Sequence, residues 1–195
     1  MIDFQDQTRI FVTSDLHFGH KNVMTFSPER ANACGSTDIK VHDEYLVKIL
    51  NETGSSCEHS VLICLGDVAL STKAAARNMS KVTTFEKKIL ILGNHDNASE
   101  SFYREACGFD MVLPMLVRYG LLFSHYPVHP HELAVNGNTS GWGRYIGNVH
   151  GHIHNNKIED PRYMCVCVEH TQLRPIRLDK IIQYYNNLYH HCEEE

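Results

Sequence analysis

The 195-residue chain is 43% hydrophobic and 21% charged, the balance of an ordinary globular protein that can bury a sizeable core. Its formal net charge of -5 excludes loose electrostatic binding to long nucleic acid, which needs a basic surface. A polyanionic partner would have to be met at a bound cation, and we expect a single domain over residues 1–195.

Five short apolar runs, each closing on polar residues, are predicted to be buried strands. In chain order they are "RIFVTSDLH" (9–17), "SVLICLGD" (60–67), "KKILILGNHD" (87–96), "YGLLFSHYP" (119–127) and "YIGNVHGHIH" (145–154). Each run ends near an Asp, Asn or His, and layered α/β proteins build ligand sites at the carboxyl ends of their strands. The five strand ends can therefore feed one cleft.

Three segments between these runs are predicted to be helices. Residues 37–53 place apolar side chains at a helical period, with acids near the start of the segment. Residues 71–85 follow with Ser71 as a possible cap, and residues 99–109 form a short helix that stops at Gly108. The apolar stripe of the first helix is expected to pack on a sheet through Val41, Tyr45, Leu46, Ile49 and Leu50.

The remaining segments are a loop and a final strand followed by a helix. Residues 126–143 are rich in Gly, Pro and Asn and are predicted to form a loop over the cleft. Residues 162–189 favour one more strand and then a helix. Because the strands outnumber what one parallel sheet needs, we expect an α/β fold of two facing mixed β-sheets flanked by helices, a four-layer α/β/β/α sandwich.

The beginning of the chain and its cysteines favour a cytoplasmic protein. The first residues carry acids where a signal peptide would carry Lys or Arg, and no apolar run approaches the ~18 residues of a membrane span. The seven cysteines contain no C-x-x-C pair, so neither a disulfide framework nor a zinc knuckle is indicated. We expect reduced thiols, with Cys165 and Cys167 on one face of the last strand as small core residues.

Seven side chains at the strand ends form a ligand set that suits divalent metals. Carboxylate, carboxamide oxygen and imidazole together favour Mn²⁺, Fe, Co²⁺ or Zn²⁺ and lack the thiolates of a structural zinc site. Seven ligands are too many for one ion, whereas two ions ~3.5–4 Å apart, joined by a shared carboxylate, would use them all. The set is Asp15, His17, Asp67, Asn94, His125, His152 and His154.

These residues also carry a resemblance to a known family. The ordered blocks D-x-H, GD, GNH-[DE], H and GH-x-H are all present, and together they resemble the signature of the calcineurin-like metallophosphoesterases. The stretches "TSDLHFGHKN", "GNHD", "SHYPVHP" and "VHGHIH" are most similar to the small bacterial and phage phosphoesterase branch. The resemblance runs from about Phe11 to Pro175 and implies the fold expected above.

The resemblance implies two metal sites and a reaction. One site would use Asp15, His17, Asp67 and His154, and the other Asp67, Asn94, His125 and His152, with Asp67 as the bridge. Two divalent ions, Mn²⁺ first and Fe, Ni²⁺, Co²⁺ or Zn²⁺ as alternatives, would lower the pKa of a bridging water. The hydroxide would attack phosphorus in line. His95 would donate a proton to the leaving oxygen, with Asp96 orienting its ring.

The implied substrate is a small phosphate ester, most simply a nucleotide-like phosphomonoester or phosphodiester. His20 and Asn22 follow the first ligand pair and are expected either to line the pocket or to form a turn. Arg144 and Lys21 are candidates for a second phosphate or the polar part of the substrate. His150 lies next to the ligands but outside the pattern, so it is expected either to support a ligand without binding metal itself or to be structural. The stretch "SPER" at 27–30 departs from the Arg-Pro-Phe often found in relatives and affects the shape of the pocket.

Two other functions fit parts of this pattern. A non-catalytic relative would keep the fold for protein binding, but it would be expected to lose ligands or the GNH histidine, and all are retained here. A protein that stores or senses metal through its histidines would leave His95 and Asp96 without a role. An enzyme that acts on small phosphate esters explains the most residues.

Overall fold

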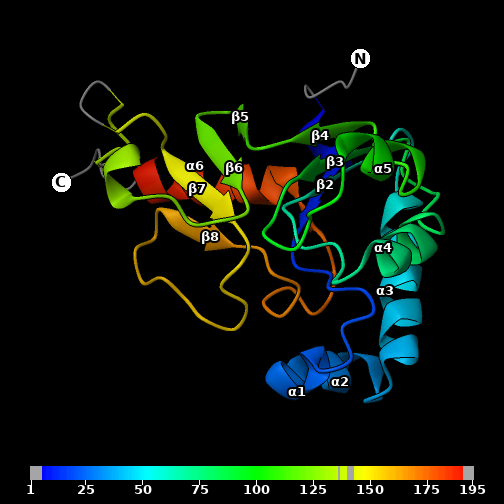
Figure 1. The fold of residues 1–195 in the computed structure, drawn as a ribbon. Helices are drawn as coiled ribbons and strands as arrows, with labels where there is room; N and C mark the ends of the chain where they lie inside the picture. The colour runs from blue at the N-terminus through cyan, green and yellow to red at the C-terminus, as the bar shows by residue number, and fades with distance from the viewer. Residues whose placement is uncertain (1–5, 136, 140–142, 191–195) are drawn as a thin grey trace.

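The strands of the computed structural model, which describes residues 6–135, 137–139 and 143–190, form two mixed sheets (Figure 1). In chain order they are β1 Ile10–Thr13, β2 Val61–Cys64, β3 Lys87–Ile91, β4 Met111–Leu113, β5 Leu116–Arg118, β6 Leu121–Ser124, β7 Gly147–His150, β8 Tyr163–Cys165 and β9 Ile176–Arg177. The first sheet has the order β4-β3-β2-β1-β9 and the second β5-β6-β7-β8. Only β9 and β5 pair antiparallel with their neighbours. The expected two mixed sheets flanked by helices are confirmed.

The helices are α1 Val23–Phe26, α2 Pro28–Cys34, α3 Ile39–Gly54, α4 Thr72–Met79, α5 Glu100–Glu105 and α6 Leu178–His190, with 3-10 turns η1 Gln7–Arg9 and η2 Pro130–Glu132. None of these helices in the described stretches has the length and apolar character that crossing a bilayer requires. The sequence did not predict α1, α2, β4, β5 or β9. Its first and last helices are confirmed as α3 and α6.

The other two predicted helices are shorter than expected. Ser71 caps α4 by accepting from the Ala74 amide at 3.3 Å, but α4 ends at Met79 rather than near residue 85. The chain turns away there because Asn51 on α3 accepts from the amide of Thr83 at 2.9 Å. The predicted third helix, α5, ends at Glu105, and Gly108 lies in the turn that follows with φ of +73°.

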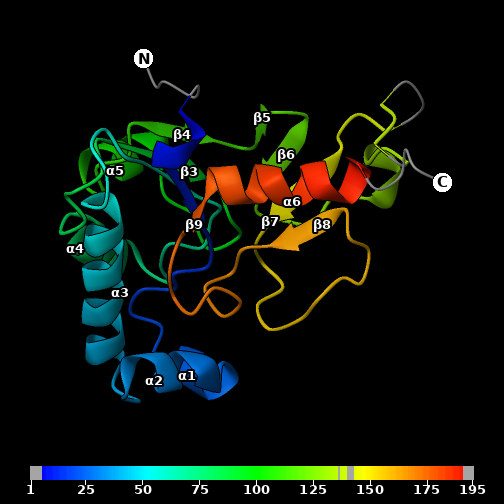
Figure 2. The ribbon, with the colours of Figure 1, turned by 180° about the vertical axis from the view of Figure 1, so that it is seen from behind.

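Two apolar cores hold the layers together. Between the sheets, Ile63 and Ile89 pack with Phe123 and Val149, and α6 adds Tyr185 to the same cluster. On the outer face of the first sheet, strand residues of opposite parity pack against α3, α4 and α5, as the alternation of a strand requires. Figure 2 shows α6 running across the second sheet, while α3 and α4 cover the side of the first.

One turn of α3 departs from the predicted stripe. Val41 is 39% exposed, and His42 and Asp43 are buried in its place. The carboxylate of Asp43 explains the change, because it accepts from the Gly19 amide at 3.1 Å and from Nδ2 of Asn78 at 2.9 Å. A buried acid with these partners stabilises the loop that follows β1. This loop carries the first pair of predicted metal ligands.

Candidate metal centre

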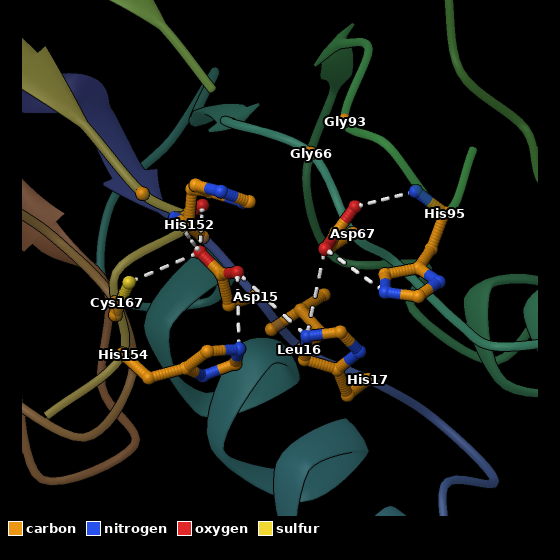
Figure 3. A network of polar contacts seen from close by, with 12 residues as sticks. Asp15, Leu16, His17, Gly66, Asp67, Gly93, His95, His152, His154 and Cys167 are labelled. Atoms are coloured by element: carbon orange, nitrogen blue, oxygen red, sulfur yellow. Dashed lines mark hydrogen bonds and ion pairs between the residues drawn. The ribbon is translucent and has the colours of Figure 1, made fainter. Parts of the chain in front are cut away.

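The polar residues predicted at five strand ends converge in the structure. Asp15 and His17 follow β1, Asp67 follows β2, Asn94 follows β3, and the remaining histidines follow β6 and β7. Strands β1, β2 and β3 run parallel, as do β6 and β7, so their carboxyl ends open on one edge of the two sheets. Figure 3 shows the resulting site, with Asp67 between His17 and His95.

The candidate ligands include two groups of three residues. Asp15, His17 and His154 each offer an atom within 4.8 Å of the others, and so do Asp67, His125 and His152. Asn94 joins the second group, because its Oδ1 lies 2.9 Å from Nε2 of His125. These groups have the composition expected for two neighbouring metal sites.

Asp67 stands between the two groups. Its Oδ2 lies 3.6 Å from Nε2 of His17 and 3.5 Å from Nε2 of His125. Its Oδ1 accepts from the backbone amide of His95 at 2.9 Å, which fixes the rotation of the carboxylate. One carboxylate therefore faces ligands of both groups, as a bridging ligand would.

The hydrogen bonds of the His125 imidazole indicate that its free nitrogen suits a cation. Nδ1 of His125 lies 2.8 Å from the carbonyl of Leu65, which can only accept, so this nitrogen carries the proton. Its Nε2 then presents a lone pair to the oxygen of Asn94 at 2.9 Å. Two acceptors face each other there, and a divalent cation would satisfy both.

Buried atoms without partners point to the same chemistry in the first group. Oδ1 of Asp15 and both ring nitrogens of His17 are buried, and among the described residues none of these atoms has a hydrogen-bond partner. Leaving such groups unsatisfied is unfavourable unless something else binds them. The residues present therefore fit divalent cations, with oxygen and nitrogen ligands and no thiolate.

The backbone at the site is strained. Left-handed conformations favour glycine and cost other residues about 1–3 kcal/mol each. They persist here because main-chain hydrogen bonds hold the loops, such as those from Asp15 to Gly66 and from His17 to Asp67, each 3.0 Å long. The positive φ values are 59° at Asp15, 50° at His17, 53° at Asp67, 70° at His152 and 48° at His154.

Glycines let the site loops approach each other. A Cβ on Gly93 would lie 2.3 Å from Oδ1 of Asp67, and one on Gly151 would lie 2.0 Å from Oγ of Ser14. Both contacts are far too short for real atoms. These positions therefore need glycine for space.

A buried ion pair that the sequence did not reveal supports His154. Oε1 of Glu169 accepts from Nδ1 of His154 at 2.9 Å and from Nη2 of Arg30 at 2.6 Å. Burial raises the pKa of Glu169, but the bonds from His154 and Arg30 outweigh burial and bring it to about 2. The fixed Nδ1 proton directs Nε2 of His154 towards Oδ1 of Asp15, 3.8 Å away.

Arg30 connects this pair to the first strand end. It is fully buried and donates to the carbonyls of Asp15 at 2.6 Å and Leu16 at 3.1 Å. Arg30 lies in the "SPER" stretch that departs from the pattern of relatives, which was the only sequence signal for it.

Cys167 also takes a part that the sequence did not predict. Strand β8 ends at Cys165, and Cys167 lies beyond it, paired with Ser14. Its thiol donates to Oδ2 of Asp15 at 3.1 Å, and Oγ of Ser14 donates to the same oxygen at 2.6 Å. Cys167 is buried as expected, but it orients a candidate ligand as well as filling the core.

Asp96 does not orient the ring of His95. Its Oδ2 accepts from the amides of Asp67 at 2.8 Å and Gly93 at 2.9 Å, and its Oδ1 from Val68 at 3.1 Å. Burial raises the pKa of Asp96 above its ordinary value. The predicted role is therefore replaced by another, since this carboxylate joins the loops that follow β2 and β3.

The residues predicted to bind substrate do not all lie beside the site. His20 lines a pocket beside the site, whereas Asn22 begins α1 and accepts from the amide of Thr25 at 3.0 Å, so it forms the turn. Arg144 lies at the amino-terminal end of β7, where its amide donates to Glu132, and thus opposite the end that carries His152. The structure does not bring Arg144 to the site.

The other histidines lie outside the two groups. His150 is buried and its Nδ1 lies 2.9 Å from the carbonyl of Gly151, which agrees with a structural role. His129 and His131 are exposed on the loop over β7, with ring centroids 4.8 Å apart. Lys21 is exposed.

A family model and three known proteins are similar to this chain. Residues 8–190 match a family model described as calcineurin-like phosphoesterase. An uncharacterised protein of Methanocaldococcus jannaschii is 23% identical over 184 residues, which is 90% of each chain. A protein of unknown function from Aquifex aeolicus aligns with a TM-score of 0.62 and 22% identity, over 89% of this chain and 97% of that one. The nuclease MPE of Pseudomonas putida aligns with a TM-score of 0.46 and 20% identity, over 75% and 62%.

Proposed function

Because the chain belongs to the calcineurin-like phosphoesterase family, we propose that it is a two-metal phosphoesterase that hydrolyses a small, nucleotide-like phosphomonoester or phosphodiester. The observation that carries the proposal is the position of Asp67, whose Oδ2 faces His17 at 3.6 Å and His125 at 3.5 Å. A carboxylate shared by two groups of ligands is what a dinuclear hydrolytic centre requires.

The ligands divide between two cations as the family resemblance implies. Asp15, His17, Asp67 and His154 would hold one, and Asp67, Asn94, His125 and His152 the other. When bound, such ions activate water at neutral pH and neutralise charge on the phosphoryl group. The oxygen and imidazole ligands of the two groups suit manganese, with Fe, Ni²⁺, Co²⁺ or Zn²⁺ as alternatives.

His95 has the geometry of a proton donor to the leaving oxygen. Its Nε2 lies 3.9 Å from Oδ2 of Asp67, and its ring contacts that of His17 edge-to-face with centroids 5.4 Å apart. The side chain remains partly exposed and lines the pocket with His17 and His154. An imidazole placed there can protonate an alkoxide as the ester bond breaks. Asp96 contributes by holding the loop that carries His95.

Other features support a small substrate and a reducing compartment. A net charge of -5 disfavours long nucleic acid. Free thiols at the six described cysteines support the cytoplasm, and the family match over residues 8–190 supports one domain. A protein-binding scaffold would have no use for strained ligands aimed at one point, so we favour an enzyme.

The test uses purified protein loaded with Mn²⁺ and assayed on nitrophenyl phosphate monoester and diester. We expect hydrolysis of at least one ester, loss of activity and of bound metal in Asp67→Ala, and loss of turnover in His95→Gln with metal content close to that of the wild type. Lys48→Gln, an exposed change on α3, is the control.

Metal content is measured by elemental analysis beside each rate. An Asp67→Ala variant that keeps both metals and full activity would contradict the bridging role. No hydrolysis under Mn²⁺, Ni²⁺, Co²⁺ or Zn²⁺ would contradict the enzyme.

A further inference from the structure

A pocket opens directly beside the first group of candidate ligands. It has a volume of about 440 Å³, enough for a group the size of a nucleoside. One side is formed by His17, His95 and His154, and the other by the α1 region and by the turn that follows β7. The residues of these two outer parts are His20, Val23, Phe26, Ser27, Asn155 and Asn156.

Phe26 gives this pocket a flat apolar surface. Its side chain is 69% exposed, although Val23 and Met24 on the same helix are buried in the core. The Phe26 ring meets His20 edge-to-face with centroids 6.1 Å apart, and His20 meets His17 at 5.7 Å. One imidazole thus separates Phe26 from a candidate metal ligand, so a substrate held at the metals can reach the Phe26 ring.

The lining of the pocket does not suit a second phosphate group. Among its described lining residues there is no Lys or Arg, which a second phosphate group would need. Asn155 and Asn156 supply amide groups instead. Nδ2 of Asn155 donates one hydrogen bond to Glu29, and Nδ2 of Asn156 donates one to the carbonyl of Ile153. Their Oδ1 atoms remain available to accept from hydroxyl or amino groups.

We propose that this pocket binds the leaving group of the substrate, and that the leaving group is a nucleoside whose base stacks on Phe26. The inference rests on the proposed function, in which His95 protonates the leaving oxygen. His95 lines the pocket, so the leaving group lies on this side of the phosphate. An uncharged ring system with hydroxyl groups matches an aromatic surface and two amide acceptors.

The experiment compares two esters that differ only in the base. Adenosine 5'-monophosphate and ribose 5-phosphate, or their methyl diesters if the protein hydrolyses only diesters, are assayed with the Mn²⁺-loaded wild type, Phe26→Ala, Phe26→Tyr and Met115→Ala. Met115 is half exposed on the β4–β5 turn and serves as the matched control. Binding of both esters to the metal-free proteins is measured by calorimetry.

We expect the wild type to prefer the nucleotide in kcat/KM. Base stacking on an aromatic side chain contributes roughly 5- to 150-fold per base, so the preference should fall at least fivefold in Phe26→Ala. It should be retained in Phe26→Tyr and Met115→Ala. The metal-free wild type should bind the nucleotide more tightly than ribose 5-phosphate, and Phe26→Ala should lose this difference.

The outcomes separate the two proposals. Equal hydrolysis of both esters with no effect of Phe26→Ala would overturn the nucleoside pocket and leave the phosphoesterase intact. Nucleotide binding that depends on Phe26, without hydrolysis of either ester or of the nitrophenyl esters, would support the pocket and overturn the proposed reaction. A preference that survives in Phe26→Ala would also overturn the role of Phe26.

Discussion

Replacing Glu169 by Gln tests how far the orientation of the candidate ligand His154 depends on its hydrogen-bond partner, while His154 itself is unchanged. Oε1 of Glu169 accepts from His154 at 2.9 Å and from both Nε and Nη2 of Arg30, at 2.8 and 2.6 Å. Gln keeps the size and one carbonyl oxygen but removes the charge. It therefore weakens the orientation of His154 and leaves a buried guanidinium without its counter-charge.

Two separate losses follow from this geometry. Mutation of a residue that hydrogen-bonds to a metal-binding histidine typically lowers metal affinity 10- to 100-fold. This corresponds to about 1.4–2.7 kcal/mol. The free energy of unfolding of the metal-free protein should also fall by about 3 kcal/mol. This value lies at the lower end for breaking a buried ion pair, because Arg30 still donates to the carbonyls of Asp15 and Leu16.

Calorimetric titration with Mn²⁺ measures the first loss and urea unfolding of metal-free protein the second. Glu159→Gln, an exposed change in a surface pair with Lys157, should alter neither quantity. In Arg30→Met/Glu169→Leu, apolar side chains replace the whole pair, which should recover stability while Mn²⁺ affinity stays low. If Glu169→Gln binds Mn²⁺ within twofold of the wild type, His154 does not depend on this carboxylate and the reasoning is refuted.

Three further predictions follow from other contacts. Asp96→Asn keeps the shape of the side chain but turns one acceptor into a donor that faces main-chain amides. We expect the free energy of unfolding in urea to fall by about 2 kcal/mol and the Mn²⁺ content to fall, and an unchanged Mn²⁺ content would refute the role of Asp96. Gly151→Ala should abolish Mn²⁺ binding because its Cβ would overlap Ser14, whereas Gly35→Ala, at φ +70° in open space, should lower the free energy of unfolding by only about 1–2 kcal/mol and keep Mn²⁺ binding. Equal Mn²⁺ titrations of the two variants would contradict this. Burial lowers the pKa of Lys88 below 10.5, so between the lowered pKa and 10.5 the unfolded chain binds more protons than the folded one, and Lys88 makes the free energy of unfolding rise with pH. The difference in free energy of unfolding between the wild type and Lys88→Met should therefore rise with pH in that range, and a difference that falls would refute this.

The sequence could predict what depends on local pattern. Short apolar runs that close on polar residues are a local signal, so the ends of β1, β2, β3, β6 and β7 and the candidate ligands on them were predictable before the structure. The short strands β4, β5 and β9 were missed, because two or three residues give too little pattern. The helices that carry Phe26 and Arg30 were also missed, because they span only four and seven residues.

Partners set by tertiary folding could not be predicted. Arg30 and Glu169 are separated by 139 positions, and no spacing rule joins them. Asp96 follows His95 in sequence, yet its carboxylate turns to the amides of the loops that follow β2 and β3. Arg144 is only a few residues from the GH-x-H block, but β7 runs between them and puts them at opposite ends of a strand.

The left-handed backbone at Asp15, His17, Asp67, His152 and His154 sets a limit on how this protein can be improved. Glycine at these positions would relieve the chain, so a screen that rewards heat resistance alone would enrich variants that have lost a candidate metal ligand. The summed penalty, about 5 kcal/mol or more, is comparable to the whole stability of many domains. Directed evolution of a more stable form therefore needs metal in the medium and a selection for turnover, because substitutions at these five residues that raise stability would lower activity.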